Sequence, residues 1–257
     1  MKQLCSVLES PKQPLARLYL GGNTALGDEI TEELFIALNK GSTVTALSLS
    51  NTSLADCEWA RFLPFMSRLS TLDLSFNLVT DDELGKLSKA LERTYCVNHL
   101  DLSFNRFGGI KCNVLEHLIA QNGALLSLSL SGNRCEDSMW TALHRGLLVN
   151  NTLLTLNLSE CSISLQCALE ICKAFCKNDI VSIDFGNNPL PEALILDPRA
   201  YAMEHLHKVA VKKVIARRQR AATPDTANTN TTTNTAKIAF TPDPVLPLHP
   251  AAHALSA

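Results

Sequence analysis

The segment LSTLDLSFN at Leu69–Asn77 returns as VNHLDLSFN at Val97–Asn105 and as LLSLSLSGN at Leu125–Asn133, at a spacing of 28 residues. The same template, L-x-x-L-x-L-x-x-N/C, fits four further segments, and the seven copies begin 25 to 29 residues apart. The further copies begin at Leu15, Val44, Leu153 and Ile180. A fixed period of this length indicates a solenoid, in which each copy buries its apolar side chains against the next.

Within each copy, apolar residues at positions 4 and 6 alternate with polar residues at positions 5 and 7, which predicts a short strand with one buried face. Position 9 is a sharp turn, where a carboxamide can both donate to and accept from backbone groups. Asparagine fills this position in five copies, and threonine or cysteine fills it in the other two: Asn23, Thr52, Asn77, Asn105, Asn133, Cys161 and Asn188.

A helix is predicted after each turn. In the segment TDDELGKLSKAL, which begins at Thr80, the residues Leu84, Leu87 and Leu91 have helical spacing. Thr80 and Glu83 are spaced as a capping box, in which each side chain bonds the backbone N–H of the other residue. One repeat is therefore predicted to be strand, turn and helix.

Stacked strands lie about 4.8 Å apart while packed helices need about 10 Å, so the array must curve. The sequence predicts an α/β fold, a horseshoe-shaped solenoid with parallel strands on the concave face and helices on the convex face. The repeats resemble the ribonuclease-inhibitor-like class of leucine-rich repeat proteins over roughly residues 1–196. That resemblance implies a fold, and the site must decide the function.

Four regions are expected along the chain. Residues 1–14 form an N-terminal cap, because the first copy of a solenoid exposes a core edge. Residues 15–196 form the leucine-rich repeat solenoid of seven repeats, and residues 199–220 form a basic C-terminal helix. Residues 221–257 are rich in Thr, Asn and Pro, and we expect this tail to be disordered.

Composition points to a cytoplasmic protein. The chain has no run of about 18 apolar residues and no apolar stretch near its start that would serve as a signal peptide, so neither membrane insertion nor secretion is expected. Its nine cysteines are an odd number scattered over the repeats, which suits a reducing compartment. The group Cys167, Cys172 and Cys176 lacks a C-x-x-C pair, so we interpret it as a buried helix face rather than a metal site. No metal and no cofactor are expected.

Charge is divided unevenly between the solenoid and the predicted basic helix. Residues 1–203 carry a net charge of −6, whereas residues 204–220 carry +5. Three functions suit this basic segment: docking to an acidic partner, nuclear localisation, or packing against the acidic solenoid. An RNA contact is a fourth reading, but we do not expect a nucleic-acid partner. The candidate residues are Lys212, Lys213, Arg217, Arg218 and Arg220.

Binding is expected on the concave face, because strand positions 3, 5 and 7 alternate with the buried leucines and point away from the core. Position 8 adds an aromatic pair, Phe76 and Phe104, which we expect to be neighbours at the edge of this face. The alternative is that each ring only covers the adjacent turn. The candidate protein-binding residues are Tyr19, Asp73, Phe76, His99, Asp101, Phe104, Asn157 and Asp184.

The sequence holds no nucleotide-binding, metalloprotease or nucleophile-elbow motif. His99 lies in the repeat array near Asp73 and Asp101, but no activated nucleophile accompanies it. We therefore predict a non-enzymatic scaffold that binds another protein.

The repeats are also similar to those of the GTPase-activating protein of the nuclear-transport GTPase Ran. That resemblance implies an alternative, regulation of a small GTPase, with Arg106 and Arg134 as cationic contacts. The chain departs from that family in having only seven copies and no long acidic C-terminal region.

Overall fold

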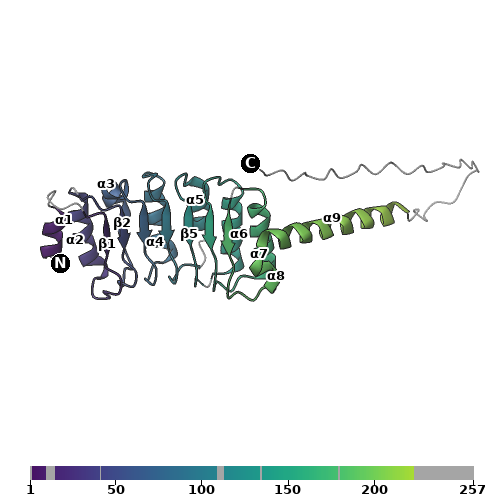
Figure 1. Ribbon diagram of the computed structural model, residues 1–257, viewed down its shortest axis with the longest axis horizontal. Coiled ribbons are helices and arrows are strands. Elements are labelled where there is room, and N and C mark those ends of the chain that lie inside the picture. Colours follow the sequence, from purple (N-terminus) through teal and green to yellow (C-terminus); the bar gives the residue numbers. More distant parts are fainter. Residues whose placement is uncertain are drawn as a thin grey trace, which may run out of the picture. The chain divides into compact units, whose positions relative to one another are not determined.

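A computed structural model describes residues 2–9, 15–40, 42–108, 113–133, 135–178 and 180–222. Seven strands of three residues each form one parallel sheet in chain order, β1 to β7, so every repeat pairs with the copies next to it (Figure 1). The strands are β1 Arg17–Tyr19, β2 Ala46–Ser48, β3 Thr71–Asp73, β4 His99–Asp101, β5 Ser127–Ser129, β6 Thr155–Asn157 and β7 Ser182–Asp184.

Each strand is followed by helical structure, and the first short helix precedes β1. The helices are α1 Lys2–Leu8, α2 Gly27–Asn39, a 3-10 helix η1 Trp59–Phe62, α3 Leu63–Met66, α4 Asp81–Leu91, α5 Asn113–Gln121, α6 Asp137–Leu147, α7 Leu165–Phe175, α8 Glu192–Leu196 and α9 Pro198–Ala222. The alternation of parallel strands and helices confirms the predicted leucine-rich repeat solenoid.

The core consists of the template leucines. The middle residue of every strand, at position 4, is buried, as Leu72 and Leu100 illustrate at 1% and 2% exposed. Leu72 pairs with Leu100 in the sheet register, and Leu100 pairs with Leu128, so these side chains form a continuous row. Position 6 adds a second row, in which Leu74 and Leu102 are 0% exposed. Each apolar residue is thus covered by the same residue of the next repeat, which is why no single repeat is expected to be stable alone.

The position 9 asparagines bond the turns together as predicted. Asn77 Nδ2 donates to the carbonyls of Leu49 and Leu74 at 2.7 and 3.1 Å, and its Oδ1 accepts from the N–H groups of Thr52 and Leu54. One carboxamide therefore links two successive repeats and pairs two N–H groups that would otherwise be buried without partners. Asn188 makes the same four bonds. Asn133 bonds two carbonyls and accepts from the Asn105 N–H.

Repeat two departs from the others in its helical part. Its period is the shortest, 25 residues from Val44 to Leu69, and the segment between the strands forms only η1 and α3. Aromatic side chains fill the space that a longer helix would occupy. The ring of Phe35 from α2 contacts those of Trp59, Phe62 and Phe65 at centroid distances of 4.9 to 5.9 Å.

The predicted capping box at the start of α4 is wrong. The Thr80 side chain makes no capping hydrogen bond. Glu83 turns to the previous repeat instead, where its Oε2 accepts from the Cys57 N–H at 2.9 Å and its Oε1 pairs with Lys86 at 2.8 Å. The buried Cys57 N–H of the preceding repeat needs a hydrogen-bond acceptor, and this requirement outweighs capping of the helix by Glu83.

A short helix lies at each end of the array: α1 precedes β1, and α8 follows β7. Leu8 of α1 is buried in the same core as the strands, as is Leu194 of α8. Residues 1–211 form one compact unit, and the chain from Lys212 onward forms a second. Residues 1 and 10–14 of the expected cap lie outside the described residues. Of the tail predicted over residues 221–257, residues 221–222 belong to helix α9 instead, and residues 223–257 lie outside the described residues. In the described ranges no helix combines the length and apolar character needed to cross a bilayer.

The buried cysteines give a test of this core. Burial raises the pKa of the Cys161 and Cys172 thiols to about 12, and it also raises the pKa of Cys57 and Cys135. Because the thiolate is the reactive form, we expect these four residues to react with iodoacetamide at pH 8 at least about a hundredfold more slowly than a free thiol. Peptide mass spectrometry before and after addition of urea measures this, with the partly exposed Cys5 as the native-state control. Rapid labelling of Cys172 in the native protein would contradict the described packing.

Candidate functional site

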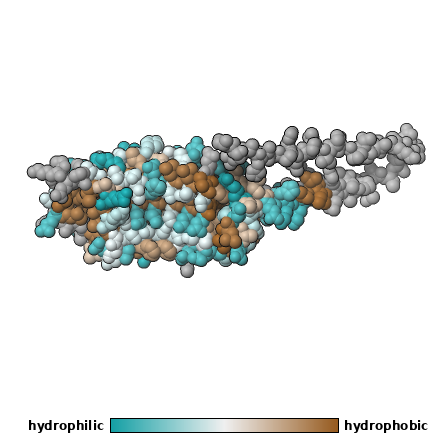
Figure 2. All heavy atoms as spheres, viewed as in Figure 1, coloured by the Kyte–Doolittle hydropathy of each residue, from teal (hydrophilic) through white to brown (hydrophobic). Residues whose placement is uncertain are grey.

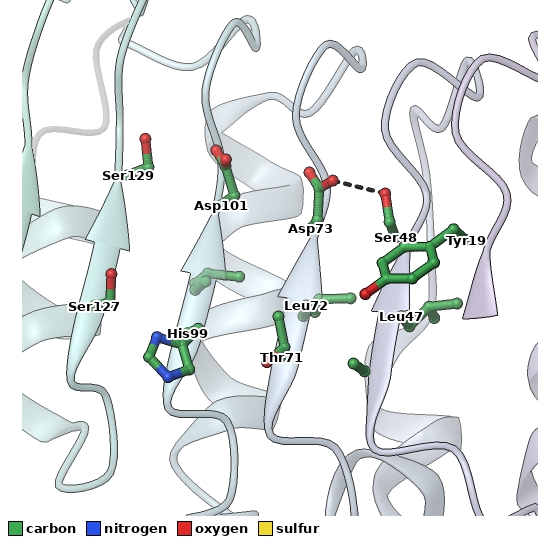
Figure 3. Close-up of a pocket in the computed structure, with 12 residues that line it drawn as sticks. Tyr19, Leu47, Ser48, Thr71, Leu72, Asp73, His99, Asp101, Ser127 and Ser129 are labelled. Atoms are coloured by element: carbon green, nitrogen blue, oxygen red, sulfur yellow. Dashed lines mark hydrogen bonds between the residues drawn. The ribbon is translucent and has the colours of Figure 1, made fainter. Parts of the chain in front are cut away.

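The position 5 side chains form one row across the sheet. Register places Tyr19 beside Ser48, Ser48 beside Asp73, and Asp73 beside Asp101, and the row continues through Ser129 and Asn157 to Asp184. Figure 3 shows the side chains of this row from Tyr19 to Ser129 pointing to the same side of the sheet, with helices on the other side. We call the surface made by positions 3 and 5 the strand face.

A hollow of about 350 Å³ lies on the strand face over β1 to β5. Its walls include Tyr19, Asp73, His99 and Asp101, and in Figure 3 the Tyr19 ring leans toward Ser48 and Leu47. The structure therefore brings four of the eight predicted binding residues around one hollow. Asn157 and Asp184 share the row but lie on β6 and β7, beyond the strands that line it.

The two aspartates of this hollow also hold the chain where it leaves the strand. Asp73 Oδ1 accepts from the Ser75 N–H and hydroxyl, and its Oδ2 accepts from the Ser48 hydroxyl at 2.6 Å. Asp101 Oδ1 accepts from the N–H and hydroxyl of Ser103. These carboxylates are acceptors in a local Asp-x-Ser turn. Asp73 uses both of its oxygens in this way, whereas Asp101 uses only Oδ1.

His99 lies apart from the two carboxylates. It is the first residue of β4 whereas Asp101 is the last, and Figure 3 shows the imidazole at the opposite end of the strand from Asp101. The carboxylate oxygens of Asp73 are instead bonded to Ser48 and Ser75. The arrangement thus supplies an exposed imidazole for contact with a partner.

The expectation that position 7 faces the open surface is wrong in the three central repeats, although Gly21 is exposed and Ser50, Ser159 and Gly186 are half-buried. Ser75, Ser103 and Ser131 are each 6% exposed. Their hydroxyls bond to neighbouring hydroxyls, as in the 2.8 Å contact between Ser131 and Ser159. The chain begins to turn at this position, so a small side chain is covered by the residue that follows it. Position 8, rather than position 7, is the exposed position at the strand ends.

Position 8 has a special backbone conformation in all seven repeats. Its residues all have positive φ, from 52° at Asn51 and Phe104 to 81° at Gly22. In the adjacent repeats the position 8 N–H donates to the position 7 carbonyl of the next copy, as Phe76 does to Ser103 at 2.9 Å. The stack therefore imposes the left-handed conformation whatever the side chain. We call these residues the turn row: Gly22, Asn51, Phe76, Phe104, Gly132, Glu160 and Asn187.

Phe76 and Phe104 stack on each other in the turn row. Their ring centroids are 4.4 Å apart and their planes are inclined by 10°. Phe104 also leans over the next turn, because a Cβ added to Gly132 would lie only 2.3 Å from its ring. Phe76 remains 54% exposed, and its outer face is open to a partner. The predicted pairing is confirmed, and the covering of the adjacent turn is also observed.

A second hollow, of about 430 Å³, continues along the turn row beyond this stack. We call it the turn hollow, and it is lined by Phe104, Gly132, Glu160, Ser162 and Asn187. Glu160 is not among the site residues predicted from the sequence. The signal that would have found it is its position 8 register, which places its carboxylate in the same row as the two aromatic rings.

The structure adds little to the other sites predicted from the sequence, which are the basic segment of α9 and the two arginines after the turns. Lys212 and Lys213 are exposed on α9 in the second unit, and α9 also contains Arg217, Arg218 and Arg220, so a docking or localisation role for this segment stays a prediction. Arg106 is exposed after the turn of repeat four, whereas Arg134 lies outside the described residues. The described part of the chain contains no group of three His, Cys, Asp or Glu side chains placed to hold a metal ion.

Comparison with known proteins finds a distant structural similarity. No family model matches the chain, and no curated protein matches its sequence. Among solved structures, an internalin from Listeria monocytogenes aligns with 63% of this chain at a TM-score of 0.37 and 17% identity. The chain spans about half of that protein, 47% of its length. At this level of similarity the internalin carries no argument about what the present protein binds.

Proposed function

We propose that this protein is a non-enzymatic scaffold that binds another protein through the strand face and the turn row, with Phe76 as the central anchor. One observation carries the proposal: an aromatic pair is held in a left-handed backbone conformation at an exposed edge. Phe76 has a φ of 54°, which costs a residue with a Cβ about 1–2 kcal/mol. The repeat hydrogen bonds impose this conformation at every turn row position, and the other five residues there are Gly, Asn or Glu. The choice of two large rings, one of them 54% exposed, is therefore what points to binding.

The surroundings of the pair support this proposal. Large aromatic side chains are frequent binding anchors, and the neighbouring hollow of the strand face supplies polar groups around them. Figure 2 shows apolar residues interspersed with polar ones over the face in view, without one apolar patch that covers it. The polar groups of the strand-face hollow would form the periphery around this anchor.

The subclass and compartment belong to the same proposal. A helix in most repeats and a period near 28 residues support the ribonuclease-inhibitor-like class. The free cysteines of the described residues suit a reducing compartment such as the cytosol. We do not extend the proposal to activation of a small GTPase, because no contact described above favours that function.

The Phe76→Asn variant tests the anchor. Asparagine already occupies the turn row at Asn51 and Asn187, and it tolerates positive φ. The loss of the ring pair, about 0.5–1.5 kcal/mol, is therefore offset by relief of strain, and we expect the free energy of unfolding to change by less than about 1 kcal/mol. Partner affinity should fall about thirtyfold or more, because a ring at the centre of the interface is removed.

Tyr95→Asn is the matched control. Tyr95 is also an exposed aromatic residue with positive φ, at 67% exposure and 48°, but it follows α4 and lies outside the turn row. Quantitative mass spectrometry of proteins captured from a cell lysate compares the wild type with both variants. The captured partner is then purified, and its affinity and its protection of residues 74–78 and 102–106 from hydrogen exchange are measured. Equal binding by Phe76→Asn and the wild type would refute the proposed anchor.

A further inference from the structure

The turn hollow has the chemistry of a site for a cation. Phe104 forms one wall, and an aromatic ring presents a negative electrostatic face. Glu160 contributes a carboxylate to the same hollow, where it accepts a long hydrogen bond of 3.4 Å from Asn187. Within the described residues Glu160 forms no ion pair, so its charge is not neutralised by this part of the chain.

Gly132 keeps the hollow open. It is the turn row residue between Phe104 and Glu160, and any side chain there would meet the Phe104 ring. The backbone of the hollow is held in place, because the Phe104, Gly132 and Glu160 N–H groups each donate to the next repeat at 2.7 to 2.9 Å. The backbone that carries the aromatic ring, the glycine and the carboxylate is therefore in place before a partner binds. This lowers the entropy cost of ordering the site on binding.

We infer that the turn hollow binds an arginine side chain of the partner protein, next to the apolar contact that the partner makes with Phe76. A guanidinium group is flat, so it can lie against the Phe104 ring while its N–H groups donate to the Glu160 carboxylate. A lysine ammonium lacks this planar geometry. The net charge of −6 on residues 1–203 also favours a cationic segment. This inference rests on the proposed function and adds the chemistry of the partner.

Selection of peptides tests the inference without knowledge of the natural partner. The probe is a phage-displayed library of random dodecamer peptides, selected on the full chain after removal of peptides that bind the Phe76→Asn variant. We expect an arginine at one fixed position of the selected peptides, near an apolar residue. The affinity of a synthetic selected peptide should fall about tenfold or more when its arginine is replaced by the neutral isostere citrulline.

Glu160→Gln should reduce the affinity for the arginine peptide by a similar factor, about tenfold, and should cause no further loss for the citrulline peptide. Glu29→Gln, which changes an exposed glutamate of α2, is the matched control and should bind the peptide as the wild type does. Urea unfolding confirms that each variant remains folded.

The outcomes separate the two proposals. Selected peptides without an arginine preference, or an arginine peptide bound equally by Glu160→Gln, would overturn the arginine site while the Phe76 anchor stands. If no peptide that binds the wild type survives the removal of Phe76→Asn binders, the proposed function would be overturned, and the arginine site would fall with it.

Discussion

Replacing Asn77 with alanine is expected to lower the free energy of unfolding by about 3–5 kcal/mol. The side chain is 3% exposed, and it pairs the carbonyls of Leu49 and Leu74 and the N–H groups of Thr52 and Leu54. Alanine leaves the Thr52 and Leu54 N–H groups buried without partners, and each unpaired group costs about 1–3 kcal/mol before the structure relaxes. The two carbonyls each lose one of two donors, because Thr52 Oγ1 still bonds Leu49 and Asn105 Nδ2 still bonds Leu74. Urea unfolding followed by circular dichroism measures the change.

Asn23→Ala is the control for this prediction. Asn23 holds the same template position in repeat one, but its side chain is exposed and bonds only the Leu20 carbonyl. Water can replace that bond, so the loss should stay below about 1 kcal/mol. Asn77→Cys should lie between the two alanine variants, because the Cys161 thiol of repeat six donates to two carbonyls. Equal losses of unfolding free energy in Asn77→Ala and Asn23→Ala would show that the stability of the stacked turns does not depend on the buried amide side chains.

Gly146→Ala is expected to destabilise the protein by about 2–3 kcal/mol, although alanine is the better helix former. A Cβ at this position of α6 would lie 2.9 Å from the Glu116 carbonyl oxygen and 3.0 Å from the Ile119 Cβ of α5. The nearest atom belongs to the backbone, so the two helices must move apart, which breaks the packing of the repeats. This loss exceeds the helix propensity gain of about 1 kcal/mol.

Gly85→Ala in α4 should have the opposite sign. A Cβ there would meet nothing within 4 Å, so the substitution adds no clash and reduces the conformational entropy of the unfolded chain. We expect a stabilisation of about 0.5–1 kcal/mol. The two variants are compared by the same urea titration. A destabilised Gly85→Ala or an unchanged Gly146→Ala would contradict the described helix packing.

The parallel sheet and its core could be predicted from the sequence, because both depend on the alternation of apolar and polar residues within each repeat. Leu72 and Leu74 alternate with polar residues, and this alternation by itself determines which face of β3 is buried. Repetition at nearly equal spacing then places Leu100 beside Leu72 and Asn105 beside Asn77. The stacking of Phe76 on Phe104 follows from the same rule, because equal template positions become neighbours in a solenoid.

Two features could not be predicted in this way: the capping at the start of α4, and which turn residues are exposed. Glu83 forms the spacing of a capping box, yet it bonds the Cys57 N–H of the previous repeat. Ser103 alternates as an exposed residue would, yet the chain has already begun to turn and the side chain is 6% exposed. In both cases the deciding contact comes from another repeat, and no local pattern records it.

The sequence by itself thus determined the repeat, the parallel order of the strands, the buried leucines and the role of the turn asparagines. Only the tertiary structure decided that Asp73 is engaged by serine hydroxyls, that Phe76 is held in a left-handed conformation, and that Glu160 shares a hollow with Phe104. The physical reason is that the first group depends on periodicity along one chain segment. The second group depends on which neighbouring repeat supplies a hydrogen-bond partner or leaves a gap, as Gly132 does.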